Sequence, residues 1–109
     1  MTEAIIYDIT IDAGADYQID FFYEDDDGTV ISAEGWTCEA QLREYPESDE
    51  YQTFSCSADE DGFHLTIGHS ISQNIGYTKG CYDVFIIDPD GERTKLSKGR
   101  AFILPRTTR

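Results

Sequence analysis

Apolar and polar residues alternate one by one along much of the chain, a pattern typical of β-strands with one buried face. Two such strands are predicted near the N-terminus, from Ala4 to Asp12 and from Tyr17 to Glu24, with a turn at 13–16 between them. Their expected inward-facing residues are Ile5, Tyr7, Ile9, Ile11, Tyr17, Ile19, Phe21 and Tyr23.

The alternation continues through the middle of the chain. A strand is predicted over 36–43, and Pro46 with its polar neighbours then opens an exposed loop. The segments 51–58 and 63–67 flank the sequence DEDG and are predicted to form a hairpin. The residues expected inside are Trp36, Cys38, Ala40, Leu42, Phe63, Leu65 and Ile67.

The C-terminal third contains one strongly apolar segment. Residues 82–88 are apolar on both faces, which predicts a strand at the centre of a sheet. The sequence DPDGE then predicts a turn into two further strands, over 93–96 and 100–104.

One helical turn is predicted, from Ser70 to Ile75. Ser70 precedes Gln73 by three residues, as in a capping box, and Ile71 and Ile75 are four residues apart. Gly76 is expected to end this turn.

Together these elements predict one all-β domain spanning residues 1–109. About seven or eight short strands with one helical turn favour an antiparallel sandwich that is Ig-like in architecture. The cysteine and tryptophan spacing of antibody domains is absent. Asp-Gly pairs ending at Gly28, Gly62 and Gly91 are expected to form the tight turns.

The charge is strongly negative and unevenly spread. The net charge is −14, and residues 1–78 hold 18 acidic residues against one basic residue, Arg43. Residues 79–109 hold 7 basic residues against 4 acidic ones. Such a chain repels a phosphate backbone, so nucleic acid is not an expected partner.

The three cysteines, Cys38, Cys56 and Cys81, have no CxxC spacing and cannot all pair within one chain. We expect reduced, buried thiols. The apolar runs are far too short for a signal peptide core or a membrane span. The expectation is a soluble protein that folds in a reducing cytoplasm, with no membrane partner.

The acidic cluster before Gly28 raises the question of calcium. With Gly28 at position six of an EF-hand loop, position one is Tyr23, which cannot supply the required ligand. A solvated acidic turn is therefore the favoured interpretation, and no metal or other cofactor is expected. A nonstandard calcium site at Asp25, Asp26 and Asp27 remains the alternative.

No arrangement of residues predicts catalysis. The chain lacks a GxSxG sequence, a cysteine near a histidine in a recognisable pattern, and a glycine-rich phosphate loop. His64 and His69 are interpreted as surface histidines. The protein is expected not to be an enzyme, with no catalytic and no cofactor-binding residues.

The basic C-terminal end and a few tyrosines near loops are the predicted contacts to a partner. In repeated copies, one basic end could meet the acidic turns of a neighbour. The candidates are Lys98, Arg100, Arg106, Arg109, Tyr45, Tyr51 and Tyr77. An aromatic sugar-binding surface is an alternative role for the exposed tyrosines.

Three segments in order resemble a family of small virion-associated proteins of tailed bacteriophages. These are YDITIDAGADYQIDFFYEDDDG, TVISAEGWTCEAQLRE and GCYDVFIIDPDGERTKLSKGRAFILPRTTR, with FHLTIGHSISQNIGYTKG between the last two. The sequence SAEG at 32–35 departs from the family's DLTG and keeps only the glycine.

The resemblance covers nearly the whole chain and implies a β-sandwich similar to the N-terminal domain of upper-baseplate proteins. It implies a structural virion protein without catalysis, made in a bacterial cytoplasm. The expected partners are other virion proteins of the tail, baseplate or fibre, with several symmetric copies in the particle. A capsid decoration protein is the nearest alternative. A carbohydrate-binding sandwich and an acidic inhibitor that mimics DNA are the more distant ones.

Overall fold

The protein is a β-sandwich with one short helical turn. The structure, a computed structural model, describes residues 5–24 and 27–107. The larger sheet contains β1 (Ile5–Ile6), β2 (Ile9–Asp12), β6 (Thr37–Arg43), β7 (Gln52–Thr53), β10 (Lys79–Ile87) and β11 (Arg93–Leu104). The smaller sheet contains β3 (Tyr17–Phe21), β8 (Ser55–Asp59) and β9 (Gly62–Ile67). A separate hairpin contains β4 (Tyr23–Glu24) and β5 (Val30–Ile31).

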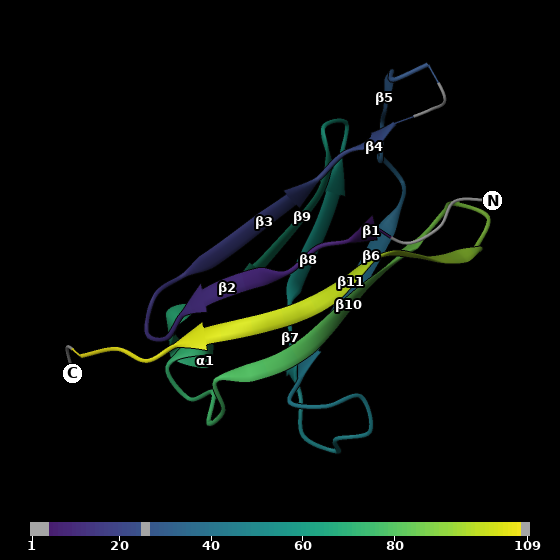
Figure 1. Cartoon of the computed structure of the whole chain (residues 1–109). Coiled ribbons are helices and arrows are strands. Elements are labelled where there is room, and N and C mark those ends of the chain that lie inside the picture. The colour runs from purple at the N-terminus through teal and green to yellow at the C-terminus, as the bar shows by residue number, and fades with distance from the viewer. Residues whose placement is uncertain (1–4, 25–26, 108–109) are drawn as a thin grey trace.

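The two sheets face each other across a single hydrophobic core (Figure 1). This confirms the predicted all-β sandwich. The smaller sheet contributes Phe63, Leu65 and Ile67 of β9, which are at most 1% exposed, as the alternation predicted. The larger sheet contributes Ile9, Ile11, Ala40, Leu42, Tyr82, Val84, Ile86, Ala101 and Ile103.

Strand β10 lies at the centre of the larger sheet, as its apolar sequence predicted. It pairs antiparallel with β6 on one side and with β11 on the other. Its residues Tyr82, Val84 and Ile86 point into the core, so the residues between them point outward. The register of β10 therefore decides which side chains of the sheet face solvent.

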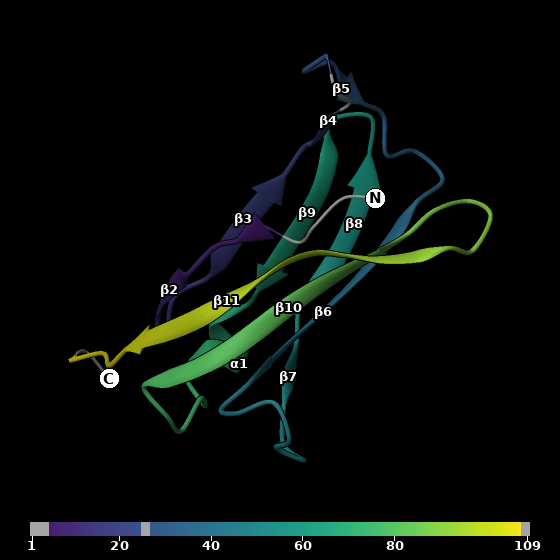
Figure 2. The ribbon, with the colours of Figure 1, turned by 45° about the vertical axis from the view of Figure 1, so that its right-hand side comes forward.

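The N-terminal strand departs from the expected antiparallel arrangement. It is divided into β1 and β2, and both pair parallel to β11 at the edge of the sheet (Figure 2). At the break, the hydroxyl of Tyr82 donates a hydrogen bond to the backbone carbonyl of Tyr7, and the Oγ of Ser97 donates to that of Ile5. The buried Tyr82 and Ser97 thus fasten a strand that no local pattern could assign to this edge.

The division also changes the burial of the first strand. Ile9 and Ile11 are buried as predicted, but Ile5 and Tyr7 are 53% and 51% exposed. The expectation that these two residues lie inside was wrong. Both side chains instead line an open hollow between this edge and β3 of the smaller sheet, together with Ile19 and Phe21.

The two predicted C-terminal strands form one strand, β11. The register between β10 and β11 shifts at Val84 and Phe85, so that Ser97 is opposite Val84 and Lys95 is opposite Phe85. Leu96 is the additional residue of this β-bulge, and both Leu96 and Ser97 are buried. The polar run SKG therefore continues the strand instead of interrupting it.

The helical turn begins and ends earlier than predicted. The helix α1 spans His69–Ser72, with Gly68 as its N-cap and no side-chain cap from Ser70. Asp16 instead accepts a hydrogen bond from the backbone N–H of His69 at 2.7 Å. Gly76 does not end the helix, since its last residue is already Ser72. A carboxylate distant in sequence thus replaced the predicted capping box.

The residue of α1 that is buried is polar. Ser72 is fully buried, donates to the carbonyl of Ala15 at 2.8 Å and accepts from the N–H of Gly14 at 3.0 Å. Ile71, by contrast, is 40% exposed. The helical turn is held to the β2–β3 turn by these hydrogen bonds, together with partial packing of Ile75 on the core.

The Asp-Gly turns are confirmed at all three positions. Gly28, Gly62 and Gly91 have φ values of +81°, +130° and +93°. The surroundings of these glycines differ. A Cβ at Gly62 would collide with the backbone carbonyl oxygen of Phe21, whereas a Cβ at Gly91 would meet nothing within 4 Å.

This difference predicts unequal costs for two matched substitutions. Gly91→Ala should cost about 1 kcal/mol of unfolding free energy, since only the positive φ is unfavourable. Gly62→Ala should cost about 2–4 kcal/mol, because the strand β3 must also move away. Urea denaturation of both variants measures this, and equal losses would show that the contact with Phe21 is unimportant.

Candidate functional site

The outer face of the larger sheet carries most of the basic side chains of this acidic protein. The register places Arg43 and Arg100 on either side of Cys81, Lys98 beside Asp83, and Lys95 beside Phe85. Arg93 is opposite Ile87 at the far end of the same row. We call Arg43, Arg93, Lys95, Lys98 and Arg100 the basic face.

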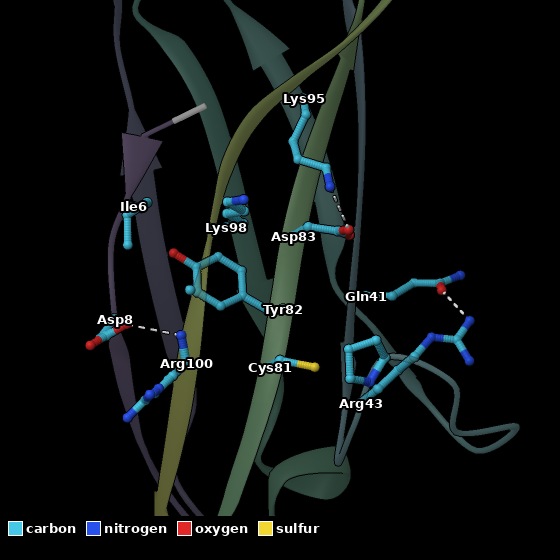
Figure 3. Close-up of a pocket in the computed structure, with 12 residues that line it drawn as sticks. Ile6, Asp8, Gln41, Arg43, Cys81, Tyr82, Asp83, Lys95, Lys98 and Arg100 are labelled. Atoms are coloured by element: carbon cyan, nitrogen blue, oxygen red, sulfur yellow. Dashed lines mark hydrogen bonds and ion pairs between the residues drawn. The ribbon is translucent and has the colours of Figure 1, made fainter. Parts of the chain in front are cut away.

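The basic face borders an open groove of about 620 Å³. Its floor is formed by β10 around Cys81 and Asp83, and its walls come from β6 on one side and from β11 with the N-terminal edge on the other (Figure 3). Among the described residues, the acidic side chains on or beside this surface are fewer than the basic ones, namely Asp8, Glu39, Glu47 and Asp83. A surface with more basic than acidic groups, on a chain of charge −14, attracts acidic partners.

Two of the basic residues are ordered by an aromatic ring. The guanidinium carbon of Arg93 lies 3.7 Å from the centre of the Phe85 ring, and the Nζ of Lys95 lies 5.2 Å from it. Each also has an exposed acidic neighbour, with Arg93 3.4 Å from Glu39 and Lys95 3.6 Å from Asp83. Such exposed ion pairs are weak, so they position these cations without removing them from solvent.

Arg43, the single base of the first 78 residues, organises the loop at the other side of the groove. Its guanidinium donates to the backbone carbonyl of Ser48 and to Oε1 of Gln41, the latter at 2.8 Å. It also lies 4.5 Å from the centre of the Tyr51 ring. The predicted contact residue Tyr51 is thus joined to the basic face by Arg43.

Within the basic face, Lys98 and Arg100 are the cations with the fewest internal partners. Among the described residues, neither side chain forms an ion pair with a carboxylate. Asp8 accepts a hydrogen bond from the backbone N–H of Arg100 at 2.9 Å, which leaves the guanidinium itself available. These two side chains, both predicted contacts, can therefore bind an external anion without breaking an existing interaction.

The remaining predicted contact residues lie outside the groove. Arg106 follows β11, and its side chain packs over Gly14. Tyr45 is 53% exposed in the loop after β6. Tyr77 is half-buried and donates to Oε1 of Gln52 at 2.7 Å, and burial raises its pKa to about 12. Arg109 lies outside the described residues.

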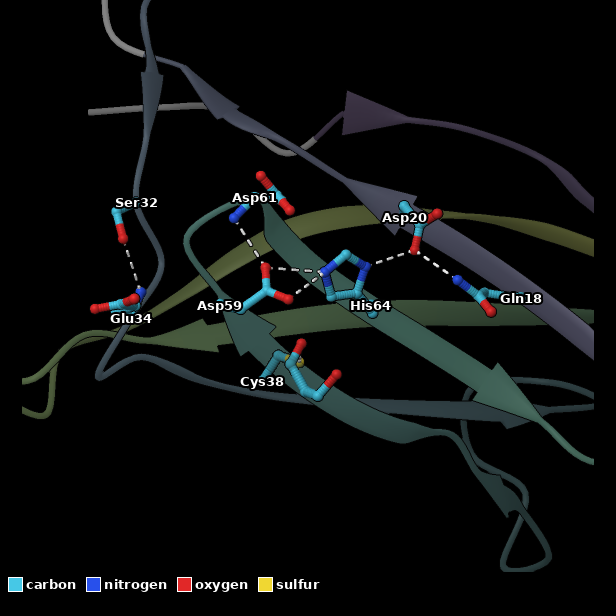
Figure 4. A network of polar contacts seen from close by, with 9 residues as sticks. Gln18, Asp20, Ser32, Glu34, Cys38, Asp59, Asp61 and His64 are labelled. Atoms are coloured by element: carbon cyan, nitrogen blue, oxygen red, sulfur yellow. Dashed lines mark hydrogen bonds and ion pairs between the residues drawn. The ribbon is translucent and has the colours of Figure 1, made fainter.

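The outer face of the smaller sheet has a different chemistry. His64 of β9 lies between two carboxylates, with Nδ1 2.7 Å from Asp20 of β3 and Nε2 3.0 Å from Asp59 of β8 (Figure 4). Asp59 also accepts from the N–H of Asp61 at 2.8 Å. His64 was expected at the surface, but its role in joining all three strands was not predicted.

The two carboxylates favour the protonated form of His64. The hydrogen bond to Asp20 raises the pKa of His64 most, and the hydrogen bond to Asp59 raises it further. His64 in turn lowers the pKa of both carboxyl groups. All three side chains are partly exposed, so this interaction is screened by solvent. His64, Asp20 and Asp59 thus form a hydrogen-bonded cluster that joins three strands, here called the clasp at His64. Its contribution to stability depends on pH.

Two of the acidic turns lie at one end of the sandwich. Both views place the β8–β9 turn and the hairpin of β4 and β5 at this end (Figures 1 and 2). The calcium alternative falls largely outside the described residues, since these include Asp27 but neither Asp25 nor Asp26. Within the described part of the chain, no group of three or more His, Cys, Asp or Glu side chains is arranged to hold a metal ion.

The groove contains a thiol, that of Cys81. Burial raises the pKa of the Cys81 thiol, and the negative charges of Asp83 and Glu47 raise it further. The thiol is therefore protonated and a weak nucleophile at neutral pH. The histidines are not near it, because both form contacts on the smaller sheet or at α1. No helix among the described residues has the length and apolar character needed to cross a membrane.

Sequence reasoning identified Lys98 and Arg100 but missed Arg43, Arg93 and Lys95 as members of the same surface. Strict alternation would have placed Lys95 and Lys98 on opposite faces, because they are three residues apart. The bulge at Leu96 puts them on one face. The only local signal was the density of bases between 93 and 100.

The fold and the charged groove define an all-β sandwich protein with a basic sheet face. No protein-family profile matches the chain, and comparison with curated proteins finds no significant match.

The clasp at His64 predicts a pH-dependent contribution to stability. The pKa of His64 is raised above 6.5, so its contribution is complete below that pH and is lost as pH rises through the folded-state pKa. The pKa values of Asp20 and Asp59 are lowered below 3.8, so their contribution is lost in stronger acid.

The stability difference between wild type and His64→Gln should therefore be largest between about pH 4 and 6.5 and should shrink above this range. Urea denaturation across pH measures it. His69→Gln is the comparison, because that ring contacts one exposed carboxylate, Asp16. A difference that stays constant from pH 5 to 9 would contradict the clasp.

Proposed function

We propose that the protein is a non-enzymatic structural component of a tailed-phage virion, which docks to tail, baseplate or fibre proteins through its basic face. The observation that carries the proposal is the concentration of Arg43, Arg93, Lys95, Lys98 and Arg100 on one sheet face of a chain with a net charge of −14. The order of segments that resembles small virion proteins supports the location in the particle.

Electrostatics supports docking to an acidic protein surface. A basic face on an otherwise acidic molecule orients an approaching partner, since the remainder of the surface repels it. The side chains of Lys98 and Arg100 provide the strongest attraction because they have no carboxylate partner among the described residues. The aromatic support of Arg93 and Lys95 by Phe85 reduces the side-chain entropy that binding would cost.

Symmetric assembly fits the same geometry. Two of the acidic turns lie at one end of the sandwich and the basic face on the outer side of the larger sheet, so copies arranged in a ring could place opposite charges in contact. Capsid decoration remains the alternative within the structural class, and it would use the same face on a shell protein.

Mass spectrometry of purified virions tests the location, and immunogold labelling separates tail from head. Detection on the tail supports the proposal, whereas labelling of the shell supports capsid decoration. Absence of the protein from purified particles would contradict both.

Reversal of charge on the basic face tests the docking surface. The double variant Lys98→Glu, Arg100→Glu should fold normally, since both side chains are exposed, and should be incorporated at least about tenfold less. Arg106→Glu with Lys79→Glu is the matched control, because these exposed bases lie outside the groove. Incorporation is measured by complementation of a phage that lacks the gene, followed by quantitative blotting. Equal incorporation of the two double variants would contradict docking through the basic face.

A further inference from the structure

Two of the three cysteines lie where the chain crosses from one sheet to the other. Strand β7 pairs with β6 in the larger sheet, and the same stretch of chain then continues into β8 of the smaller sheet. Cys38 belongs to β6 and Cys56 to β8. The crossing is the place where the two sheets are connected by a continuous backbone.

The pairing of β6 with β7 leads toward these cysteines. Gln41 is opposite Thr53 and Leu42 is opposite Gln52, and the N–H of Phe54 donates a 3.0 Å hydrogen bond to the carbonyl of Ala40. Cys38 and Cys56 each lie two residues beyond this bond, where the chain has passed from the larger sheet into β8 of the smaller one. Extension of the same register would bring their Cα atoms to about 5 Å apart, within the range that a disulfide spans.

The side chains of both cysteines point to the same side. Cys38 and Cys56 are half-buried and pack against the core from the two strands. The Sγ of Cys38 lies 3.8 Å from the carbonyl oxygen of Ser57, the neighbour of Cys56. The interaction of the two neighbouring thiols lowers the pKa of Cys56 and raises that of Cys38.

We propose that Cys38 and Cys56 form a disulfide under oxidising conditions, which covalently joins β6 to β8 at the crossing between the sheets. The cysteines were expected to be reduced, buried thiols, and the proposal adds a second state to that expectation. It does not depend on the proposed function, because it concerns only the thiols and an oxidant.

The reaction balances with glutathione disulfide as the two-electron oxidant. The thiolate of Cys56 attacks one sulfur of glutathione disulfide, which forms a mixed disulfide and releases one glutathione thiolate. Cys38 then loses its proton and attacks the Sγ of Cys56, which forms the internal disulfide and releases the second glutathione. The protein loses two hydrogen atoms, and two molecules of glutathione are produced.

The third cysteine provides a matched control. Cys81 lies on the outer face of β10, where its register neighbours are Arg43 and Arg100 and not another cysteine. Its raised pKa makes it slower to react with a disulfide. Cys81→Ser should therefore leave the internal disulfide unchanged.

The test is oxidation of the purified full chain with glutathione disulfide, followed by thiol counting in denaturant, intact mass and peptide mapping. Wild type and Cys81→Ser should each lose two free thiols, and a peptide pair joining Cys38 to Cys56 should appear. Cys38→Ser and Cys56→Ser should form no internal disulfide. The oxidised wild type should melt roughly 5–15 °C above the reduced form, and this difference should vanish with dithiothreitol.

Two results would overturn the proposal. One is a wild-type protein that keeps all thiols free after prolonged oxidation under native conditions. The other is a peptide map in which Cys81 forms the disulfide, within one chain or between two copies. Mapping of the wild type decides the matter even if a serine variant fails to fold.

Discussion

The pairing of β10 with both β6 and β11 is the constraint on which the rest of the structure depends. Because side chains on a strand alternate with a period of two, one register sends Tyr82, Val84 and Ile86 into the core and Cys81, Asp83 and Phe85 to the outer face. A slip by one residue would bury Asp83 and expose the core. Hydrophobic burial thus also determines the composition of the basic face.

The core and the groove are connected through the same strand. Tyr82 packs against Phe54, with ring centres 6.4 Å apart, and its hydroxyl binds the carbonyl of Tyr7. This contact fastens the N-terminal edge, where Asp8 then binds the backbone N–H of Arg100. This wall of the groove therefore depends on the buried Tyr82. Its cations Lys98 and Arg100 are positioned by the backbone of β11 and not by ion pairs.

The two outer faces of the sandwich use charge in different ways. On the smaller sheet, His64 and its two carboxylates join three strands, so the charges there mainly serve stability. On the larger sheet, the cations are supported by Phe85 and the backbone, and Lys98 and Arg100 have no carboxylate partner among the described residues. The second arrangement leaves two cations available to an external anion.

The sequence by itself determined the all-β class, the residues of the central strands and the turns at Gly28, Gly62 and Gly91. These follow from local alternation and from the backbone freedom of glycine, which act within a few residues. The tertiary structure alone decided the parallel N-terminal edge, the capping of α1 by Asp16, the clasp at His64 and the proximity of Cys38 to Cys56. Each of these depends on a contact between residues far apart in the chain, and no local pattern encodes such a contact. The basic face depends on both the sequence and the tertiary structure. Its bases are evident in the sequence, but only the bulge at Leu96 brings Lys95 and Lys98 to the same side of the sheet.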